Sequence, residues 1–443
     1  VQLCVDTDGM ARFWIDDVHL SFTRKPRVEL LVDQLGYEAD PKSQAPIQAE
    51  RLARPGGLEA TSQLRIGSKM VVLQSTMPLD TVGPARLVDV ETTETIWEGA
   101  WLEHGYLPAW DLFHWTVDFS DVNRPGKYVL VTRAGRREVR SPPFEIAEDL
   151  LTERTAELAY RFYYFQRCGT EVPGFHAGCH LDDGVLPDGT YRDVTGGWHD
   201  AGDYNKYNGL TPESIYALAL AYHEKPSVFN RWDRDQNGLA DILDEAIWGA
   251  RWVRKMLDED RLELLADVFS GYRYWGPPEK ETDNRPKTGD ERPIRAGPGD
   301  LTHCIGGFAL LGKSLVDSDN SEAAVYGREL IQLAERMYAK IGGGIERLVP
   351  LYIATGADKY LEAARSRATA LLDAQTSSQG VHGFRELAQF ALAFPGGRRV
   401  EQILPLARNR VRELAAICDQ RFGVALNRDA DGELVYCRSY SDV

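Results

Sequence analysis

The hydrophobic pattern of this sequence changes its period near residue 148, and this change is the strongest constraint on the fold. After that position apolar residues recur at spacings of three and four, the pattern of amphipathic helices. Two intervening segments without this pattern are long enough to be functional loops, residues 168–210 and 258–300. We therefore expect an all-helical domain over residues 148–443 with functional groups on its loops. Nine helices are expected, over residues 150–168, 211–224, 239–257, 301–317, 321–341, 345–356, 358–375, 384–394 and 398–420.

The sequence before residue 148 has the pattern of short strands. From residue 24 to 147, alternating segments follow one another about every ten residues, with Pro and Gly between them. This pattern is typical of an antiparallel β-sandwich of immunoglobulin type. Residues 1–23 contain one more strand-like run, ARFWIDDVHLSF, which resembles the last strand of a β-sandwich carbohydrate-binding module. An edge strand of the following domain is an equally good interpretation of that run.

The charge balance restricts the classes of partner. The chain has 51 basic and 67 acidic residues and a net charge of -16, which disfavours nucleic acid and anionic membrane surfaces. It contains no apolar run of eighteen residues that would span a bilayer. A neutral substrate fits this composition best, and we expect a monomer.

A glycine-rich loop, GGWHDAGDYNKYNG at residues 196–209, carries two carboxylates three residues apart. Its glycines favour a turning backbone that directs side chains towards a ligand. Asp200 and Asp203 suit the activation of water, because one carboxylate accepts its proton while the other orients it and raises the basicity of the first. The alternative is that both residues only cap turns through the local backbone.

Aromatic residues accompany these carboxylates. Trp198, Tyr204 and Tyr207 offer flat faces on which sugar rings can pack. The loop at residues 272–293 adds Trp275, together with Tyr272 and Tyr274. That loop is interpreted either as part of a substrate cleft or as a solvated surface loop.

Two cysteines and two histidines form a candidate zinc set, namely Cys168, Cys179, His180 and His199. Two thiolates with two imidazoles suit tetrahedral coordination of zinc. His176 is a spare donor. The alternative is a Cys168–Cys179 disulfide, or a pair of buried thiols, with the histidines in polar contacts.

A candidate calcium loop, DRDQNGLADILD, covers residues 233–244. Oxygen-bearing side chains stand at loop positions one, three, five, nine and twelve, with Gly238 at position six, which follows the calcium-loop pattern. The alternative is a solvated turn that caps the next helix. The expected ligands are Asp233, Asp235, Asn237, Asp241 and Asp244.

The GGWHDAGDYNKY segment resembles the signature of glycoside hydrolase family 9, an inverting cellulase family. Residues 31–47, 238–256 and 351–364 are also similar to segments of that family and its N-terminal immunoglobulin-like module. The resemblance implies an (α/α)6 toroid that hydrolyses β-1,4-glucosidic bonds of cellulose or related β-glucans by inversion. It implies Asp203 as general base and Asp200 as the residue that holds the nucleophilic water. It also implies a structural zinc on the Cys and His set, and no organic cofactor.

The sequence departs from the family pattern near its end. The family's proton donor is a Glu that follows a His-His-Arg segment, and neither is found in this chain. Nine expected helices also fall short of the family's twelve, so the toroid is expected to be C-terminally incomplete. A truncated sequence, an omitted last part and a divergent member with another acid are all consistent with this. Glu433 lies in a turn-like segment and is not expected to be the acid.

Two other functions remain open on the sequence alone. The same fold could act as an exo-acting β-glucosidase or glucosaminidase, or it could bind glucan without cutting it. Because cellulose lies outside cells, the protein is expected to be extracellular.

Overall fold

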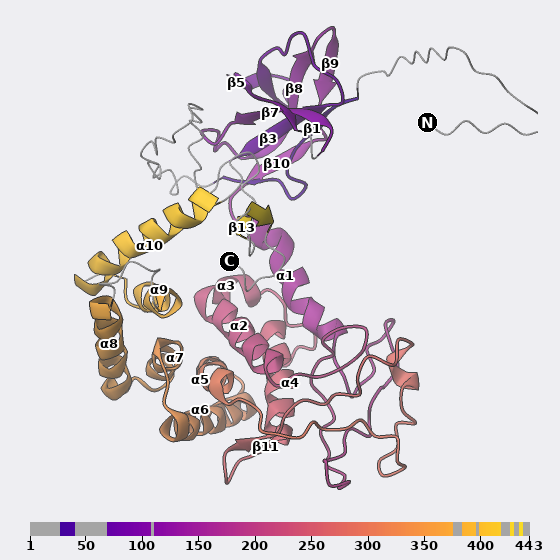
Figure 1. Cartoon of the computed structure of the whole chain (residues 1–443), viewed down its shortest axis with the longest axis vertical. Coiled ribbons are helices and arrows are strands. Elements are labelled where there is room, and N and C mark those ends of the chain that lie inside the picture. The colour runs from indigo at the N-terminus through magenta and orange to yellow at the C-terminus, as the bar shows by residue number, and fades with distance from the viewer. Residues whose placement is uncertain are drawn as a thin grey trace, which may run out of the picture. The chain divides into compact units, whose positions relative to one another are not determined.

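The computed structural model describes residues 27–39, 69–107, 110–374, 383–395, 398–417, 426–428 and 434–436 (Figure 1). These residues divide into two units, one of which ends at Glu148 while the other begins at Asp149. The strand-like run expected in residues 1–23 and the turn around Glu433 lie outside the described residues.

The first unit contains two sheets. The first sheet has the order β1 (Val28–Leu31), β3 (Met70–Ser75), β7 (Leu112–Asp118) and β6 (Leu102–Leu107). The second has the order β2 (Tyr37–Glu38), β10 (Phe144–Ala147), β8 (Gly126–Ala134), β4 (Ala85–Asp89) and β5 (Thr95–Gly99), and β9 (Arg137–Arg140) pairs with β8. Every strand pair is antiparallel except β2 with β10, which is parallel.

The two sheets share one hydrophobic core, as in a β-sandwich. Val71 and Leu73 of β3 alternate with more exposed neighbours, which is the period-two pattern of a strand with one buried face. They belong to the same buried cluster as Leu87 of β4 and Leu130 of β8, which lie in the other sheet. The expected sandwich is therefore present, whereas its immunoglobulin type stays a prediction.

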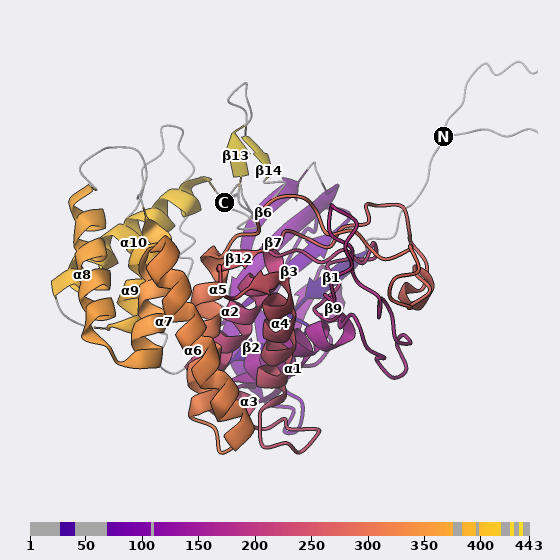
Figure 2. The same ribbon diagram turned by 90° about the horizontal axis from the view of Figure 1, so that it is seen from below.

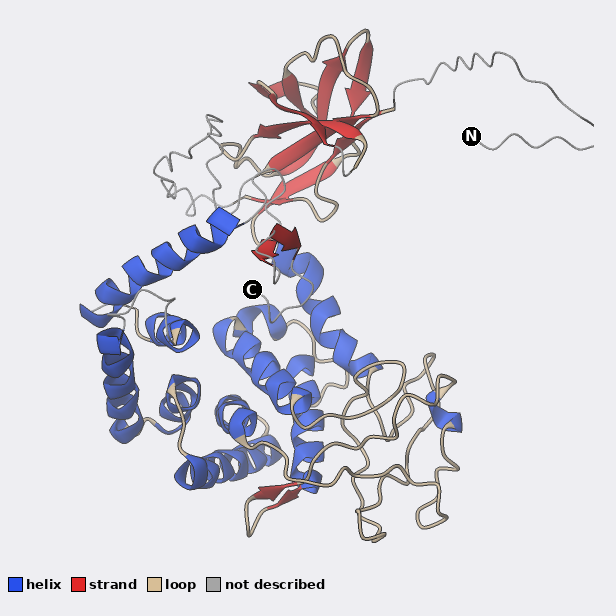
Figure 3. Cartoon of the chain, in the orientation of Figure 1, coloured by secondary structure: helices blue, strands red, loops and turns tan. Residues whose placement is uncertain are grey.

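The second unit is mainly helical, and the nine expected helices are all present. The tenth, α3, has four residues, too few for a hydrophobic period to be recognised in the sequence. Figure 3 shows long irregular loops beside this set of helices. The helices are α1 (Leu150–Phe165), α2 (Leu210–Glu224), α3 (Pro226–Phe229), α4 (Asp241–Met256), α5 (Thr302–Val316), α6 (Ser321–Ile341), α7 (Ile345–Thr355), α8 (Asp358–Asp373), α9 (Phe384–Ala393) and α10 (Arg398–Ile417).

Consecutive helices pack as hairpins in two layers (Figure 2). Helices α2, α5, α7 and α9 contact one another in succession and form one layer. Helices α4, α6, α8 and α10 form the other. Each of α4, α6 and α8 packs against two successive members of the first layer, and α10 packs against α9. This is the arrangement of an α/α barrel. The expectation that the toroid is incomplete concerns residues outside the described ranges and stays a prediction.

Short strands and a 3-10 helix interrupt the loops of this unit. Two small sheets are formed, one by β11 (Leu257–Asp258) with β12 (Glu263–Leu264) and one by β13 (Leu426–Arg428) with β14 (Leu434–Tyr436). The 3-10 helix covers Pro278–Lys280. Among the described residues, no helix is both long and apolar enough to cross a membrane.

The glycine-rich loop is held against α4 by close packing. The Trp198 ring lies where a Cβ on Gly249 would come within 2.3 Å of it, so only glycine fits there. Gly197 has a positive φ of 76°, and a Cβ there would lie 2.7 Å from the Trp252 ring. These contacts fix the start of the loop on a buried helix.

Candidate active site and metal centre

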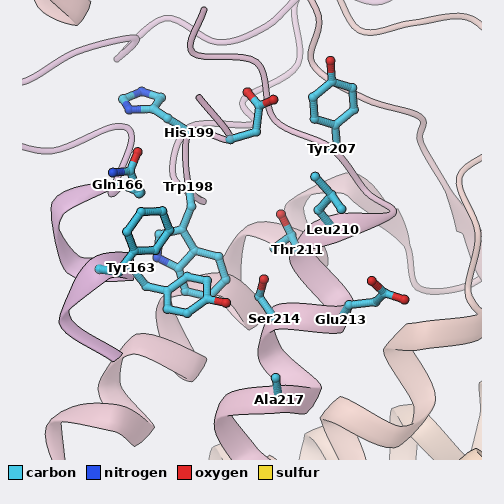
Figure 4. A pocket seen from close by; sticks show the side chains of 12 residues that line it. Tyr163, Gln166, Trp198, His199, Tyr207, Leu210, Thr211, Glu213, Ser214 and Ala217 are labelled. Atoms are coloured by element: carbon cyan, nitrogen blue, oxygen red, sulfur yellow. The ribbon is translucent and has the colours of Figure 1, made fainter. Parts of the chain in front are cut away.

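A pocket of about 350 Å³ opens beside the glycine-rich loop (Figure 4). One wall comes from the C-terminal part of α1, another from the loop itself, and a third from the first turns of α2. The lining residues are Phe162, Tyr163, Gln166, Trp198, His199, Asp200, Tyr207, Leu210, Thr211, Glu213, Ser214 and Ala217.

The two expected carboxylates occupy different positions relative to this pocket. Asp200 lines it, whereas Asp203 is only 3% exposed and is not among the lining residues. The backbone N–H of Asp200 donates to the Asn205 carbonyl at 3.0 Å, which closes the turn between the two carboxylates. Asp203 Oδ2 accepts a hydrogen bond from Asn205 Nδ2 at 2.6 Å, but its Oδ1 is buried and has no partner among the described residues.

The environment makes Asp200 a weaker acid than an ordinary aspartate. Partial burial, followed by the negative charge of Asp203, raises the pKa of Asp200 to about 6. Because Asp200 faces the open pocket, solvent screens part of this charge repulsion. The carboxyl group is therefore neutral at acidic pH and becomes a carboxylate near neutrality.

The expected aromatic residues divide between the pocket and its surroundings. Trp198 and Tyr207 line the pocket, although Trp198 is largely buried and donates its indole N–H to Glu245 at 3.4 Å. Tyr204 lies elsewhere, because its hydroxyl donates to the Gly276 carbonyl and its ring packs 4.9 Å from that of His199. Trp275 is 68% exposed, and its ring lies 3.3 Å from the position of a Cβ on Gly202. It therefore lies over the turn that carries the carboxylates.

Sequence reasoning missed one carboxylate of the pocket. Glu213 lies in the first turn of α2, and its Oε1 is 3.4 Å from Nδ1 of His303. The sequence offered one sign of this position. A helix was expected to begin just after the glycine-rich loop, so a carboxylate in its first turn lies close to the loop.

The four candidate zinc ligands are brought together. Their donor atoms all lie within 4.8 Å of one another, and all four residues are buried. We call Cys168, Cys179, His180 and His199 the Cys/His cluster. His176 is not part of it, and its Nδ1 instead faces the Ala177 carbonyl at 2.7 Å.

The geometry of the Cys/His cluster fits tetrahedral zinc. Cys168 Sγ is 3.5 Å from His180 Nδ1, and Cys179 Sγ is 3.7 Å from His199 Nε2. The two histidine nitrogens are 3.4 Å apart. Tetrahedral zinc with ordinary bond lengths separates sulfur from nitrogen by about 3.6 Å and nitrogen from nitrogen by about 3.3 Å. Both cysteines are free thiols in this arrangement, which does not contain the alternative disulfide.

Backbone hydrogen bonds explain how distant segments meet at the Cys/His cluster. The Cys168 N–H donates to the Gly197 carbonyl at 2.8 Å, and the Gly169 N–H donates to the Cys179 carbonyl at 3.0 Å. The His199 N–H donates to the Gln166 carbonyl at 2.8 Å. The segment after α1 is therefore joined to the residue that immediately precedes Asp200.

Polar groups around the cluster orient His180 and lower the pKa of Cys168. His180 Nε2 lies 2.9 Å from Glu281, which also accepts a hydrogen bond from Ser270, so the ligating nitrogen of His180 faces the cluster. Burial raises the pKa of Cys168, but the hydrogen bond from Cys179 and the nearby Lys206 ammonium outweigh burial and hold it well below its ordinary value. Cys168 is therefore favoured as a thiolate, the form that ligates metals.

A buried ionic network lies against the cluster. Asp183 accepts from Arg292 Nε at 2.8 Å and pairs with Lys206 Nζ, also at 2.8 Å. Asp183 and Lys206 are fully buried, and Arg292 is 2% exposed. Lys206 also donates to the carbonyls of Val194 and Gly196 and thereby joins the later part of the glycine-rich loop to its start.

The candidate calcium loop forms a hydrogen-bonded turn. Asp233 and Asp235 accept from the backbone N–H of Asn237, whose side chain donates to Asp244 at 3.0 Å. Asp241 pairs with Arg234 and accepts a hydrogen bond from the Tyr160 hydroxyl at 3.1 Å. Calcium binding by this loop stays a prediction.

The helical hairpins define an α/α-barrel protein, and its glycine-rich loop places a carboxylate pair beside a pocket with aromatic lining residues. The model of glycosyl hydrolase family 9 matches residues 153–340, which include the pocket and the Cys/His cluster. Endoglucanase D of Acetivibrio thermocellus is 32% identical over 188 residues, which cover 38% of this chain and 29% of that relative.

Solved structures agree with this fold. A metagenome-derived family 9 endoglucanase has a TM-score of 0.60 at 22% identity, with 90% of this chain and 75% of that chain covered. A Zn-binding triple mutant of the family 9 endoglucanase J30 has a TM-score of 0.56 at 19% identity, with 88% and 71% covered. The part of the chain that matches the family model, residues 153–340, is therefore similar to glycoside hydrolase family 9, and the sequence match spans 29% of the length of Endoglucanase D.

The buried ionic network should be essential for stability. Asp183→Asn leaves Arg292 and Lys206 buried without their anionic partner, and removal of one member of a buried ion pair costs about 3–5 kcal/mol. The expected result is a loss of that size in the free energy of unfolding, measured by urea denaturation. Asp188→Asn, on the exposed part of the same loop, is the control and should change stability by less than about 0.5 kcal/mol. Equal stability of both variants would contradict this role of Asp183.

Proposed function

We propose that the protein hydrolyses β-1,4-glucosidic bonds of a neutral β-glucan by inversion, as an endo-β-1,4-glucanase. The observation that carries this proposal is the Asp200 and Asp203 pair beside a pocket lined by aromatic side chains, within the residues that match the family model. The net charge of -16 supports a neutral polysaccharide over a polyanionic substrate.

The two carboxylates have complementary roles in this proposal. Asp203 acts as general base, and its buried Oδ1, which has no partner among the described residues, is the acceptor for a proton of the attacking water. Asp200 faces the pocket and orients that water. Inversion also needs an acid on the opposite side of the sugar to protonate the leaving oxygen. The family resemblance makes a Glu in a C-terminal segment the expected donor.

The aromatic side chains would hold the sugar chain. Trp198 and Tyr207 offer ring faces inside the pocket, and the exposed Trp275 ring extends this surface over Gly202. Tyr204 supports the loop by its contact with His199 and is not proposed as a substrate contact.

A structural zinc ion is part of the proposal. The donor distances of the Cys/His cluster, the thiolate character of Cys168 and the Zn-binding family 9 structure support it. Four protein ligands complete a tetrahedral site, so zinc would supply structural stabilisation and no open position for substrate. By holding His199, it would fix the neighbouring Asp200. Calcium on the 233–244 loop is proposed as a second structural ion, which would require Asp241 to leave Arg234.

Replacement of the base should abolish turnover but not the fold. Asp203→Asn keeps the hydrogen-bonding shape but cannot take a proton, so hydrolysis of cello-oligosaccharides should fall by about 10²-fold or more. The protein should be tested in its natural full-length, metal-loaded form, with circular dichroism to verify folding and Asp188→Asn as the matched control. Full activity in a folded Asp203→Asn protein would contradict the proposed base. Release of monosaccharide alone would indicate an exo enzyme, and binding without turnover in the wild type would indicate a glucan-binding protein.

Activity should fall as the pH decreases through about 6. Burial and the charge of Asp203 raise the pKa of Asp200 to about 6, so below this pH the group is neutral and orients water poorly. The folded protein favours the neutral form of Asp200, because the pKa of this group lies above its ordinary value. The stabilisation that the neutral form contributes is therefore present at about pH 4 and is lost as the pH rises through 6.

Asp203→Asn removes the neighbouring charge and should lower the pKa of Asp200, measured by carbon-13 NMR of the carboxyl group. An unchanged pKa would contradict the coupling.

Loss of a cluster cysteine should release the metal. The wild type should contain one zinc ion per chain, measured by elemental mass spectrometry. Cys179→Ser should lower this zinc content and should also lower the melting temperature. Cys304→Ser is the control, because Cys304 is buried in α5 and lies outside the Cys/His cluster. Equal zinc content in both variants would contradict the proposed site.

A further inference from the structure

A second group of possible metal ligands lies in the same loops. One carboxylate oxygen of each of Asp182, Asp283 and Asp290 lies within 4.8 Å of the other two. We call these three residues the acidic cluster. Asp182 lies about one hundred positions before Asp283 and Asp290 in the sequence, so the folded loops bring the three together. The acidic cluster shares no residue with the Asp200 and Asp203 pair, the Cys/His cluster or the 233–244 loop.

Asp182 has a buried oxygen without a partner. Its side chain is fully buried, and its Oδ1 accepts a hydrogen bond from Thr282 Oγ1 at 2.9 Å. Its Oδ2 is also buried but has no hydrogen-bond partner among the described residues. A buried polar oxygen without a partner is costly, and the cost is larger for a charged group. A cation next to Oδ2 would remove this cost.

The other two members face solvent and are fixed by the local backbone. Asp290 Oδ2 accepts from the backbone N–H of Asp283 at 2.7 Å, and Thr288 Oγ1 lies within 3.1 Å of both carboxylates. The loop therefore holds Asp283 and Asp290 together without a bound ion.

Basic side chains do not neutralise the acidic cluster. Across the described part of the chain, none of its three members forms an ion pair. Arg292 forms an ion pair with Asp183 instead, and Lys287 Nζ lies 5.8 Å from the centre of the Tyr191 ring. Three carboxylates are thus gathered without a paired basic side chain, and one of them, Asp182, has a buried oxygen that lacks a partner among the described residues.

We propose that Asp182, Asp283 and Asp290 bind a calcium ion. All the donors are carboxylate oxygens, which suit calcium, whereas zinc prefers the nitrogen and sulfur donors of the Cys/His cluster. Oxygens on a single calcium ion lie at most about 5 Å apart, because each bond is 2.3–2.6 Å long. The 4.8 Å limit on the spacing of the three oxygens meets this condition. Water reaches the site past the two exposed carboxylates and completes the six to eight ligands that calcium takes.

The bound ion would connect the loop that carries Glu281 to the loop that carries His180. Thr282 and Asp283 immediately follow Glu281, and Asp182 lies two residues after His180. Calcium would thereby hold together the two segments whose side chains already meet at 2.9 Å in the Glu281–His180 contact. The inference does not depend on the proposed hydrolysis, because its test measures the metal alone.

The test is isothermal titration of the zinc-loaded, calcium-depleted protein with calcium chloride. The double variant Asp283→Asn/Asp290→Asn should bind one calcium ion fewer per chain than the wild type, and its melting temperature should lose the corresponding rise with calcium. Both residues are exposed, so the variant should fold. Asp188→Asn is the matched control and should bind as the wild type does.

A second variant separates this site from the 233–244 loop. Asp233→Asn/Asp235→Asn should retain the ion that the Asp283/Asp290 variant loses. Unchanged calcium stoichiometry and affinity in the Asp283/Asp290 variant would overturn the proposal, as would a wild type that binds no calcium. Magnesium bound as tightly as calcium would overturn the assignment of the ion.

Discussion

The position of the proposed active site depends on the convergence of three loop segments at the Cys/His cluster. Apart from the short β11–β12 pairing, the loops at residues 168–210 and 258–300 are held by isolated bridges and side-chain contacts, not by long strand ladders. Instead, the backbones of Cys168, Gly169 and His199 are joined to neighbouring segments, and the four donor atoms of the Cys/His cluster lie close together in a buried space. Asp200 is the next residue after His199. A small displacement of the cluster would therefore displace the carboxylate that faces the pocket.

The ionic network beneath the cluster completes this constraint. Asp183, Arg292 and Lys206 would be expensive to bury separately, but together they are paired, and Lys206 also binds two loop carbonyls. The lysine lies only three residues after Asp203. One side chain thus links the turn with the carboxylates to the buried interior, while the Gly249 and Trp198 contact fixes the other side of the loop.

Much of the fold could be predicted because it follows from local patterns. The nine longer helices have apolar residues at helical spacing, and strands such as β3 and β4 alternate, so these elements were visible without knowledge of their neighbours. The four residues of the Cys/His cluster could be named from their donor chemistry, but the sequence left a Cys168–Cys179 disulfide open, and only the family resemblance favoured zinc. The parallel pairing of β2 with β10 could not, because it joins segments that carry no local sign of their partner.

The remaining details depend on tertiary contacts between distant residues. Glu281 reaches His180 across about one hundred positions, and Arg292 reaches Asp183 across a similar separation. Tyr204 was expected to face a sugar, but its hydroxyl binds the Gly276 carbonyl. Asp241 stands at the spacing of a calcium ligand, yet its carboxylate forms an ion pair with Arg234. In each case the sequence shows which chemical group is present, whereas the residue that binds it depends on the tertiary fold.

The most direct test of the proposed hydrolysis is the anomeric configuration of the first sugar released from cellohexaose, followed by proton NMR before mutarotation. A water activated by Asp203 attacks from the face opposite the leaving group, so the account predicts that the new reducing end appears first as the α anomer. A product that appears first as the β anomer would contradict the single displacement and, with it, the roles proposed for Asp200 and Asp203.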